Sequence, residues 1–333
     1  MNRGWRAAGL LATAAALIVV CVASVMIGAK PIPVETVMGS FAGFDPANND
    51  HLFVHLERVP RTVLGVLVGA ALGLAGTVMQ AVARNPLADP GVLGINAGAS
   101  LLVVFAINFL GLTSLTGYVW FGFAGAAVAS VLVYGVSALG REGATPLKLA
   151  LAGAAANAAF VSLTTAVLLT DSDAFEQFRF WQVGSLAGRD WSVVTAVAPF
   201  ILVGVVVALC SGGLLNTRAL GDDMARALGQ NITRARVIAG VSVVLLCGAA
   251  TAAAGPIGFV GLAVPLMARL LTGPDNRWLL AYSALLAPVL VLGADVVGRI
   301  IARPGEVQVG ILTAAIGAPI FIALVRGSGV GER

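Results

Sequence analysis

Two arginines, Arg58 and Arg61, stand in the segment RVPR, directly before a long apolar run at 62–82. A guanidinium stays positively charged at physiological pH and forms paired hydrogen bonds with carboxylates. Segments that face hydrocarbon normally exclude charge, so two cations at the edge of such a segment require an explanation. The first question that this sequence raises is what these two cations bind.

A second charged pair lies near the C-terminus. Asp295 is the only acid well inside a predicted span, and Arg299 follows it one helical turn later. Acid before base at this spacing is the favourable order for an ion pair on a helix. We favour an interpretation in which the two neutralise each other near a helix mouth, and a proton relay is the alternative.

Motifs of enzyme chemistry are absent from the sequence. It has no G-x-x-x-x-G-K-[ST], and Lys30 and Lys148, its two lysines, lie outside glycine-rich loops, so a P-loop for ATP is excluded. It has no H-E-x-x-H and no G-x-S-x-G. His51 and His55 have helical spacing but too few neighbouring ligands for zinc, and we interpret them as part of an interfacial segment. We expect no catalytic residue, no bound metal and no cofactor on this chain.

The elements that must position these residues are membrane helices. Of the 333 residues, 59% are hydrophobic and 11% are charged, whereas soluble domains carry about 25% charged residues. The mean hydropathy is +0.96. Because a crossing needs about 20 apolar residues, we expect an all-α polytopic membrane protein with ten spans, at 6–28, 59–83, 92–110, 116–139, 149–171, 192–213, 237–254, 257–271, 279–302 and 307–325. The two spans around Gly255-Pro256 are short, and one broken helix is the alternative.

The distribution of cations supports this count. If both termini are cytoplasmic, thirteen of the twenty Lys and Arg residues lie on the inner side, in agreement with the positive-inside rule. The outer seven are Lys30, Arg58, Arg61, Arg179, Arg189, Arg299 and Arg303, and four of them crowd two helix mouths. The net charge of +4 therefore reflects membrane topology, and we expect no nucleic-acid partner.

Three further segments have informative patterns. Gly65, Gly69, Gly73 and Gly76 recur at helix-packing spacing and predict close contact between helices. In ARNPLADPGVLGINAGAS, residues 83–100, two prolines stop a helix, and both a tight turn and an irregular element beside a pathway remain open. In 215–236, apolar residues recur at helical spacing between polar ones, which favours a surface helix for a soluble partner over a solvated loop.

These stretches resemble the FecCD family, the permeases of bacterial importers for iron–siderophores, haem and vitamin B12. The resemblance covers almost the whole chain. It rests on RVPRTVLGVLVGAALGLAGTVMQAVARNPLADPGVLGINAGAS at 58–100, ALGDDMARALG at 219–229, GPIGFVGLAVPLMARLL at 255–271 and LGADVVGRIIARPGEVQVGILTAAIGAPIFIAL at 292–324. Two positions depart from the family pattern, Leu266 where a histidine is usual and Gln308 within the common E-L-P-V-G.

The resemblance implies the fold of a type II ABC importer permease, with residues 1–333 forming one transmembrane domain of about ten helices. Its implied partners are a second permease subunit, identical or different, two cytoplasmic ATPase subunits that bind ATP and Mg²⁺, and an extracytoplasmic substrate-binding protein. It also implies a multi-pass location in the bacterial cytoplasmic membrane. The departures at 266 and 308 favour a different second permease.

The resemblance also assigns roles to residues. Arg58, Arg61 and Arg299 would face outward and receive acidic residues of the binding protein. A coupling helix at about 216–230 would contact the ATPase through Ala219, Leu220, Gly221, Asp222, Ala225, Arg226, Leu228 and Gly229. Thr145 and Pro146 match the inner gate approximately. We add Gln80 and Asn157 as pathway candidates, because both are polar residues within apolar helices.

The expected function is therefore ATP-driven import of a ferric siderophore, with ATP hydrolysed by a partner and no enzymatic activity in this chain. Import of haem or vitamin B12 by the same machinery is the alternative. A stand-alone secondary carrier is a distant one.

Overall fold

The computed structural model describes residues 3–139 and 145–327, and in these ranges it contains helices and no strands. All ten expected spans fall on helices. These are α1 (Arg3–Met26), α4 (Val59–Ala83), α5 (Ile95–Leu110), α6 (Leu115–Ser137), α7 (Pro146–Leu168), α9 (Trp191–Cys210), α12 (Ile232–Ala254), α13 (Val260–Thr272), α14 (Asn276–Ile301) and α15 (Val309–Gly327). Within the described ranges, seven helices are long and apolar enough to cross a membrane, and α5, α13 and α15 are shorter apolar helices. The prediction of an all-α polytopic membrane protein is confirmed.

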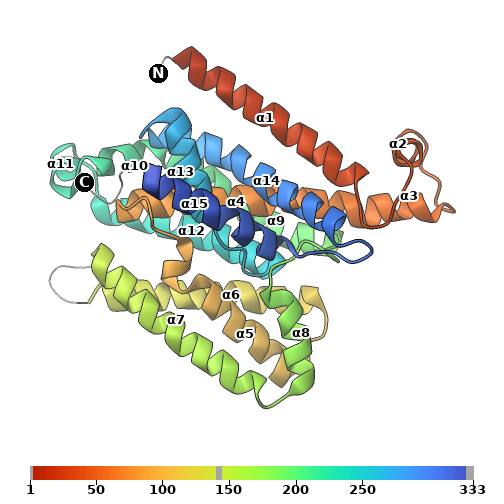
Figure 1. The fold of residues 1–333 in the computed structure, drawn as a ribbon. Helices are drawn as coiled ribbons and strands as arrows, with labels where there is room; N and C mark the ends of the chain where they lie inside the picture. The colour runs from red at the N-terminus through yellow and green to blue at the C-terminus, as the bar shows by residue number, and fades with distance from the viewer. Residues whose placement is uncertain (1–2, 140–144, 328–333) are drawn as a thin grey trace.

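Shorter helices connect the spans. They are α2 (Val34–Ala42), α3 (Asn49–Phe53), the π-helical turn η1 (Val54–Arg58), the 3₁₀ turn η2 (Pro90–Leu93), α8 (Ser172–Gln182), α10 (Gly212–Ala219) and α11 (Asp222–Ala227). Figure 1 shows α10 and α11 at one end of the molecule and α2, α3 and α8 at the other. The start of α1 and the end of α15 lie toward the α11 end, as an even number of crossings requires.

The centre of the fold is α4, which is mostly buried and packs against α14, α12, α13 and α9. Its glycines permit this contact. A Cβ on Gly69 would lie 2.5 Å from the Cα of Pro288 in α14, and one on Gly73 would lie 2.6 Å from the carbonyl oxygen of Ser283. The predicted role of these glycines in close helix packing is confirmed.

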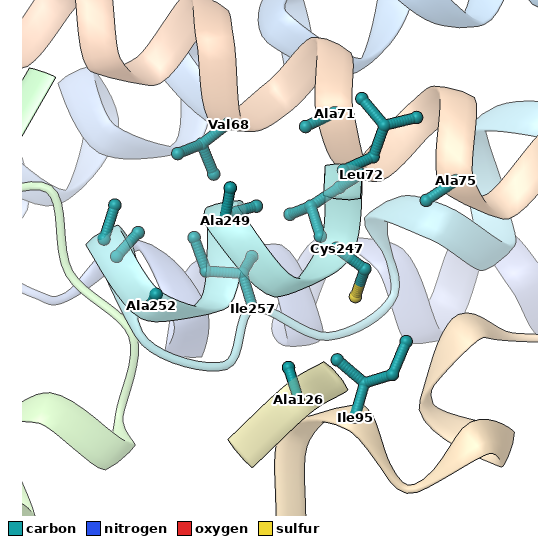
Figure 2. Packing of buried hydrophobic residues seen from close by; sticks show 14 of the residues in the cluster. Val68, Ala71, Leu72, Ala75, Ile95, Ala126, Cys247, Ala249, Ala252 and Ile257 are labelled. Atoms are coloured by element: carbon teal, nitrogen blue, oxygen red, sulfur yellow. The ribbon is translucent and has the colours of Figure 1, made fainter. Parts of the chain in front are cut away.

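Small side chains also fill the interface between α4 and α12. Figure 2 shows Val68, Ala71 and Ala75 of α4 beside Cys247 and Ala249 of α12. All five are almost completely buried. Since small residues let backbones approach closely, this interface gains its stability from dense van der Waals packing.

The segment between α12 and α13 is irregular, and two separate helices replace the alternative of one broken helix. Gly255 has φ +75° and Phe259 has φ +67°, both in the left-handed region. Protein covers this backbone, because the Ala254 carbonyl accepts a hydrogen bond from the Ser185 amide at 2.7 Å. Such coverage is what non-helical backbone needs at membrane depth.

Two helices have large exposed apolar surfaces. Little of α1 and α7 is buried within this chain, and Figure 1 shows α1 along one side of the molecule and α7 along the opposite side. An apolar helix with so little protein cover must meet lipid or another subunit.

Candidate functional site

The structure brings the three predicted docking arginines together at the end of the molecule that carries α2 and α3. Arg58 ends η1, Arg61 begins α4 and Arg299 lies in the last turns of α14. All three line one cavity of about 170 Å³, together with Lys30, Glu57 and Glu306. The clustering that the sequence predicted at two helix mouths is one shared site.

Two of these arginines bind the C-terminus of α1. Arg58 donates to the carbonyls of Val25 and Met26 at 2.9 Å each and to that of Lys30 at 2.7 Å. Arg299 donates to the carbonyls of Ser24 at 2.8 Å and Ile27 at 3.0 Å. The last carbonyls of a helix lack intrahelical partners and carry partial negative charge, so both guanidiniums stabilise this helix end.

The third arginine holds two acids. Arg61 donates to both carboxylate oxygens of Asp295, at 2.7 and 3.1 Å, and pairs with Glu306 at 2.7 Å. Asp295 also pairs with Arg299, so the predicted neutralisation of the 295–299 pair is confirmed and includes a further cation. The result is a compact network of two arginines and two acids.

The three predicted docking arginines differ in exposure and in partners. Arg58 is 2% exposed and Arg299 is 1% exposed. Arg58 donates to backbone carbonyls, and Arg299 donates to backbone carbonyls and to Asp295. Arg61 is less buried and has carboxylate partners only. Spacing alone could not reveal this arrangement, because the accepting carbonyls lie about 30 and 270 residues away in the chain.

The two histidines hold the outer segment in place. The Nδ1 atom of His51 accepts from the Asp45 amide at 3.1 Å, and a ring nitrogen of His55 lies 3.0 Å from the Ser40 carbonyl oxygen. His55 also packs against Phe41 and Phe44. Within the described residues, no group of three or more His, Cys, Asp or Glu side chains is placed to hold a metal ion.

At the opposite end, the predicted coupling segment forms α10 and α11. Gly221 has φ +102° and Gly229 has φ +77°, and these two residues bracket α11. Leu220, Met224 and Leu228 are 64%, 54% and 63% exposed, whereas Ala225 is buried. Three large apolar side chains therefore project from a polar segment.

Other residues of this segment support its local structure. Ala219 is the last residue of α10, and Asp222 is the first of α11. Arg226 pairs with Asp223 across one helical turn at 3.1 Å. Both side chains are exposed, so this pair contributes little to stability.

An asparagine that sequence reasoning did not select anchors the segment. Asn216 donates to the Asp275 carboxylate at 2.7 Å and accepts from the Asn276 amide at 2.8 Å, so it joins α10 to the start of α14. The hydrogen bond from Asn216 lowers the pKa of Asp275, and the Arg277 amide adds to the effect. The sequence contains one indication of this contact, because Asp275 follows Gly273-Pro274 and aspartate is a typical helix N-cap.

The structure describes the gate candidates in part. Thr145 is the N-cap of α7, and its hydroxyl accepts from the Lys148 amide at 3.3 Å. Pro146 is the first residue of that helix. Residues 140–144 of the matching turn lie outside the described residues.

The two pathway candidates have different surroundings. Gln80 is buried, and its amide donates to the Leu262 carbonyl of α13 at 3.3 Å. It also borders a cavity of about 210 Å³ with Arg84 and Asn276 at the α11 end. Asn157 is exposed on α7. Asn157 is therefore exposed in this conformation, whereas Gln80 contacts α13.

Residues 84–94 form a series of tight turns between α4 and α5, and residues 95–100 are the start of α5. Arg84 ends α4 in the left-handed region at φ +49°. Asn85 and Asp89 accept hydrogen bonds from the amides of Leu87 at 2.9 Å and Gly91 at 2.7 Å. Burial raises the pKa of Asp89.

The two departures from the family pattern lie in ordinary packing positions. Leu266 is buried in α13, where an apolar side chain packs without a polar partner. Gln308 precedes α15, and its carbonyl accepts from the amides of Ile311 and Leu312 in the first turn. The structure assigns neither side chain to a site.

Known proteins resemble this chain over nearly its full length. The FecCD transport family matches residues 16–327. The ferric enterobactin transport system permease protein FepD of Escherichia coli is 43% identical over 93% of this chain and 92% of its own. The probable siderophore transport system permease protein YfiZ of Bacillus subtilis is 40% identical over the same shares. A solved inward-facing structure of a putative metal-chelate type ABC transporter is 27% identical, covers 95% of this chain and 98% of its own, and has a TM-score of 0.83.

Proposed function

Because this chain belongs to the FecCD transport family, we propose that it imports a ferric siderophore across the bacterial cytoplasmic membrane. The chain is a permease of the ABC importer type and is not itself an enzyme. Two of its relatives are described as permeases for ferric enterobactin and for a siderophore, which supports this substrate class. A bulky, polar chelate needs a wide path, and one subunit with a densely packed centre does not supply one.

The path then lies between this chain and a second permease subunit. The exposed face of α7, the helix that begins directly after the gate residue Thr145, supports this placement, and Asn157 would line the path. Both termini and the coupling segment would lie in the cytoplasm, where an ATPase can reach them.

The observation that carries the proposal is the coupling segment. Leu220, Met224 and Leu228 are exposed, and Asn216 ties the same segment to α14. Exposed apolar side chains on the cytoplasmic side would fit a hydrophobic cleft on a soluble partner. Closure of a pair of ATPase subunits would move this apolar surface. The hydrogen bonds of Asn216 would then transmit the displacement to α14, and the close contact of α14 with the glycines of α4 would transmit it to α4.

In the proposed docking of the loaded binding protein, Arg61 contacts that protein and the other two arginines have a structural role. Arg58 and Arg299 would preserve the shape of the outer cavity, and the guanidinium of Arg61 would exchange Glu306 for a carboxylate of the binding protein. Such exchange keeps the cation paired throughout, which avoids the cost of an uncompensated charge. Charged contacts of this kind set encounter rate and orientation.

Substrate identity is tested by uptake into vesicles that contain this chain, its second permease and its ATPase subunits, with the binding protein outside. We expect ATP-driven accumulation of a ferric siderophore, and none of haem or vitamin B12. Uptake of haem instead would contradict the proposed substrate but would still agree with the assignment as an ATP-driven importer.

A further inference from the structure

An apolar groove runs along the outside of the helix bundle between α6 and α12. It has a volume of about 550 Å³, and its walls include Phe123, Val131, Val241 and Leu245. Val131 and Val241 are exposed within this chain. A groove of this size is within the range that binds a single small ligand.

Cations gather at one end of this groove. Arg236 and Tyr134 line both the groove and an adjoining cavity of about 50 Å³, which is also lined by Arg84 and Arg218. No acidic residue lines either hollow among the residues that the structure describes. Arg218 and Arg236 also have interactions within the chain.

The position of the groove in the membrane follows from its helices. Arg236 lies in the second turn of α12, and Tyr134 lies in the last turn of α6, both at the end that carries α10 and α11. The lining stretches 236–245 and 123–134 each rise about 15 Å, which is about half of the hydrocarbon thickness. The groove therefore spans one leaflet, with its cationic end at the cytoplasmic headgroup level.

From this geometry we propose that the groove binds an anionic phospholipid of the cytoplasmic leaflet. One acyl chain lies between α6 and α12, and the phosphate and headgroup bind Arg236 and the hydroxyl of Tyr134, with Arg84 and Arg218 adding positive potential. Basic pockets between helices on the cytoplasmic side are suited to acidic headgroups. The proposal concerns a lipid site and does not depend on which substrate the chain transports.

Two glycines in the groove wall make the proposal testable without disturbing the core. An added Cβ on Gly240 or Gly135 meets no atom within 4 Å, so a larger side chain there projects into the groove. Gly240→Leu and Gly135→Leu fill the acyl site from opposite walls. Gly293→Leu is the matched control, because Gly293 of α14 also has open space around it and lies outside the groove lining.

The experiment is native mass spectrometry of the full-length chain in mild detergent, titrated with phosphatidylglycerol or with phosphatidylcholine. We expect the wild-type chain to prefer phosphatidylglycerol, and Arg236→Gln to reduce that preference by about five-fold. Arg236→Lys keeps the charge and should keep the preference. The two groove-filling variants should lower retention of both lipids, whereas Gly293→Leu should not.

Three results would overturn the proposal. The first is equal retention of the two lipids by the wild-type chain, and the second is unchanged lipid retention in both groove-filling variants. The third is a mass spectrum that shows a second protein chain bound to the wild-type chain and released by either groove-filling variant. Thermal unfolding of each variant shows whether it is folded, and the two variants on different helices guard against the failure of one.

Discussion

At the scale of single residues, the outer arginines have two roles, because they stabilise the end of α1 and they neutralise buried acids. Arg58 and Arg299 donate to carbonyls at the end of α1, whereas Arg61 binds Asp295 and Glu306. Arg299 also pairs with Asp295. Removing one member of a buried charge network leaves the others uncompensated, which costs about 3 kcal/mol or more. We therefore expect Arg61→Gln to lower the unfolding free energy by about this amount in a detergent unfolding assay.

Lys30 provides the matched control for that loss. It is a cation at the same end of the molecule, and its pair with Asp50 at 2.7 Å is exposed. Exposed pairs contribute about 0–1 kcal/mol, so Lys30→Gln should leave stability nearly unchanged. Equal losses in the two variants would contradict the buried network.

The same network makes a prediction about docking. If a carboxylate of the binding protein replaces Glu306 on Arg61, then Glu306→Gln should tighten the association, because the competing acid is gone. Arg61→Gln should weaken it, and both effects should shrink as salt rises. Affinity measured across a salt series checks this. An unchanged affinity in both variants would remove Arg61 from the docking surface.

At the scale of helices, the close approach of α4 to α14 depends on missing side chains. A Cβ on Gly69 would meet the backbone of Pro288, which cannot move aside as a flexible side chain could. Gly69→Ala should therefore cost about 1–3 kcal/mol by overpacking. Gly293→Ala on α14 has open space and should be neutral in the same unfolding assay. Neutrality of both would contradict the packing account.

The anchor between α10 and α14 carries the prediction for coupling. Asn216→Ala removes the hydrogen bonds to Asp275 and Asn276 and lets the coupling segment move without α14. We expect ATP hydrolysis by the assembled transporter to continue while transport per ATP falls. Gln230→Ala is the control, because the Gln230 side chain donates to the Leu214 carbonyl of α10 at 3.0 Å and not to α14. Equal transport per ATP in both variants would show that the anchor is dispensable.

At the scale of the whole molecule, hydropathy predicted the ten spans because a long apolar run has one solution in lipid, a helix. The role of Gly69 and the pairing of Asp295 with Arg299 were predictable for a similar reason, since both follow from spacing along one helix. The short helices α2, α3 and α8 have no such long run and were not predicted. Contacts between distant segments, such as Arg299 with Ser24 or Asn216 with Asp275, depend on the assembled fold.

In the proposed mechanism, this permease is driven by ATP hydrolysis on a separate protein. The most direct measurement is ferric-siderophore uptake by vesicles that contain the permease pair, with and without the ATPase subunits. We predict uptake only with the ATPase and ATP, and its loss in Met224→Asp, which puts a charge on the apolar surface of α11. Uptake by the permease pair alone, driven by an ion gradient, would contradict the account.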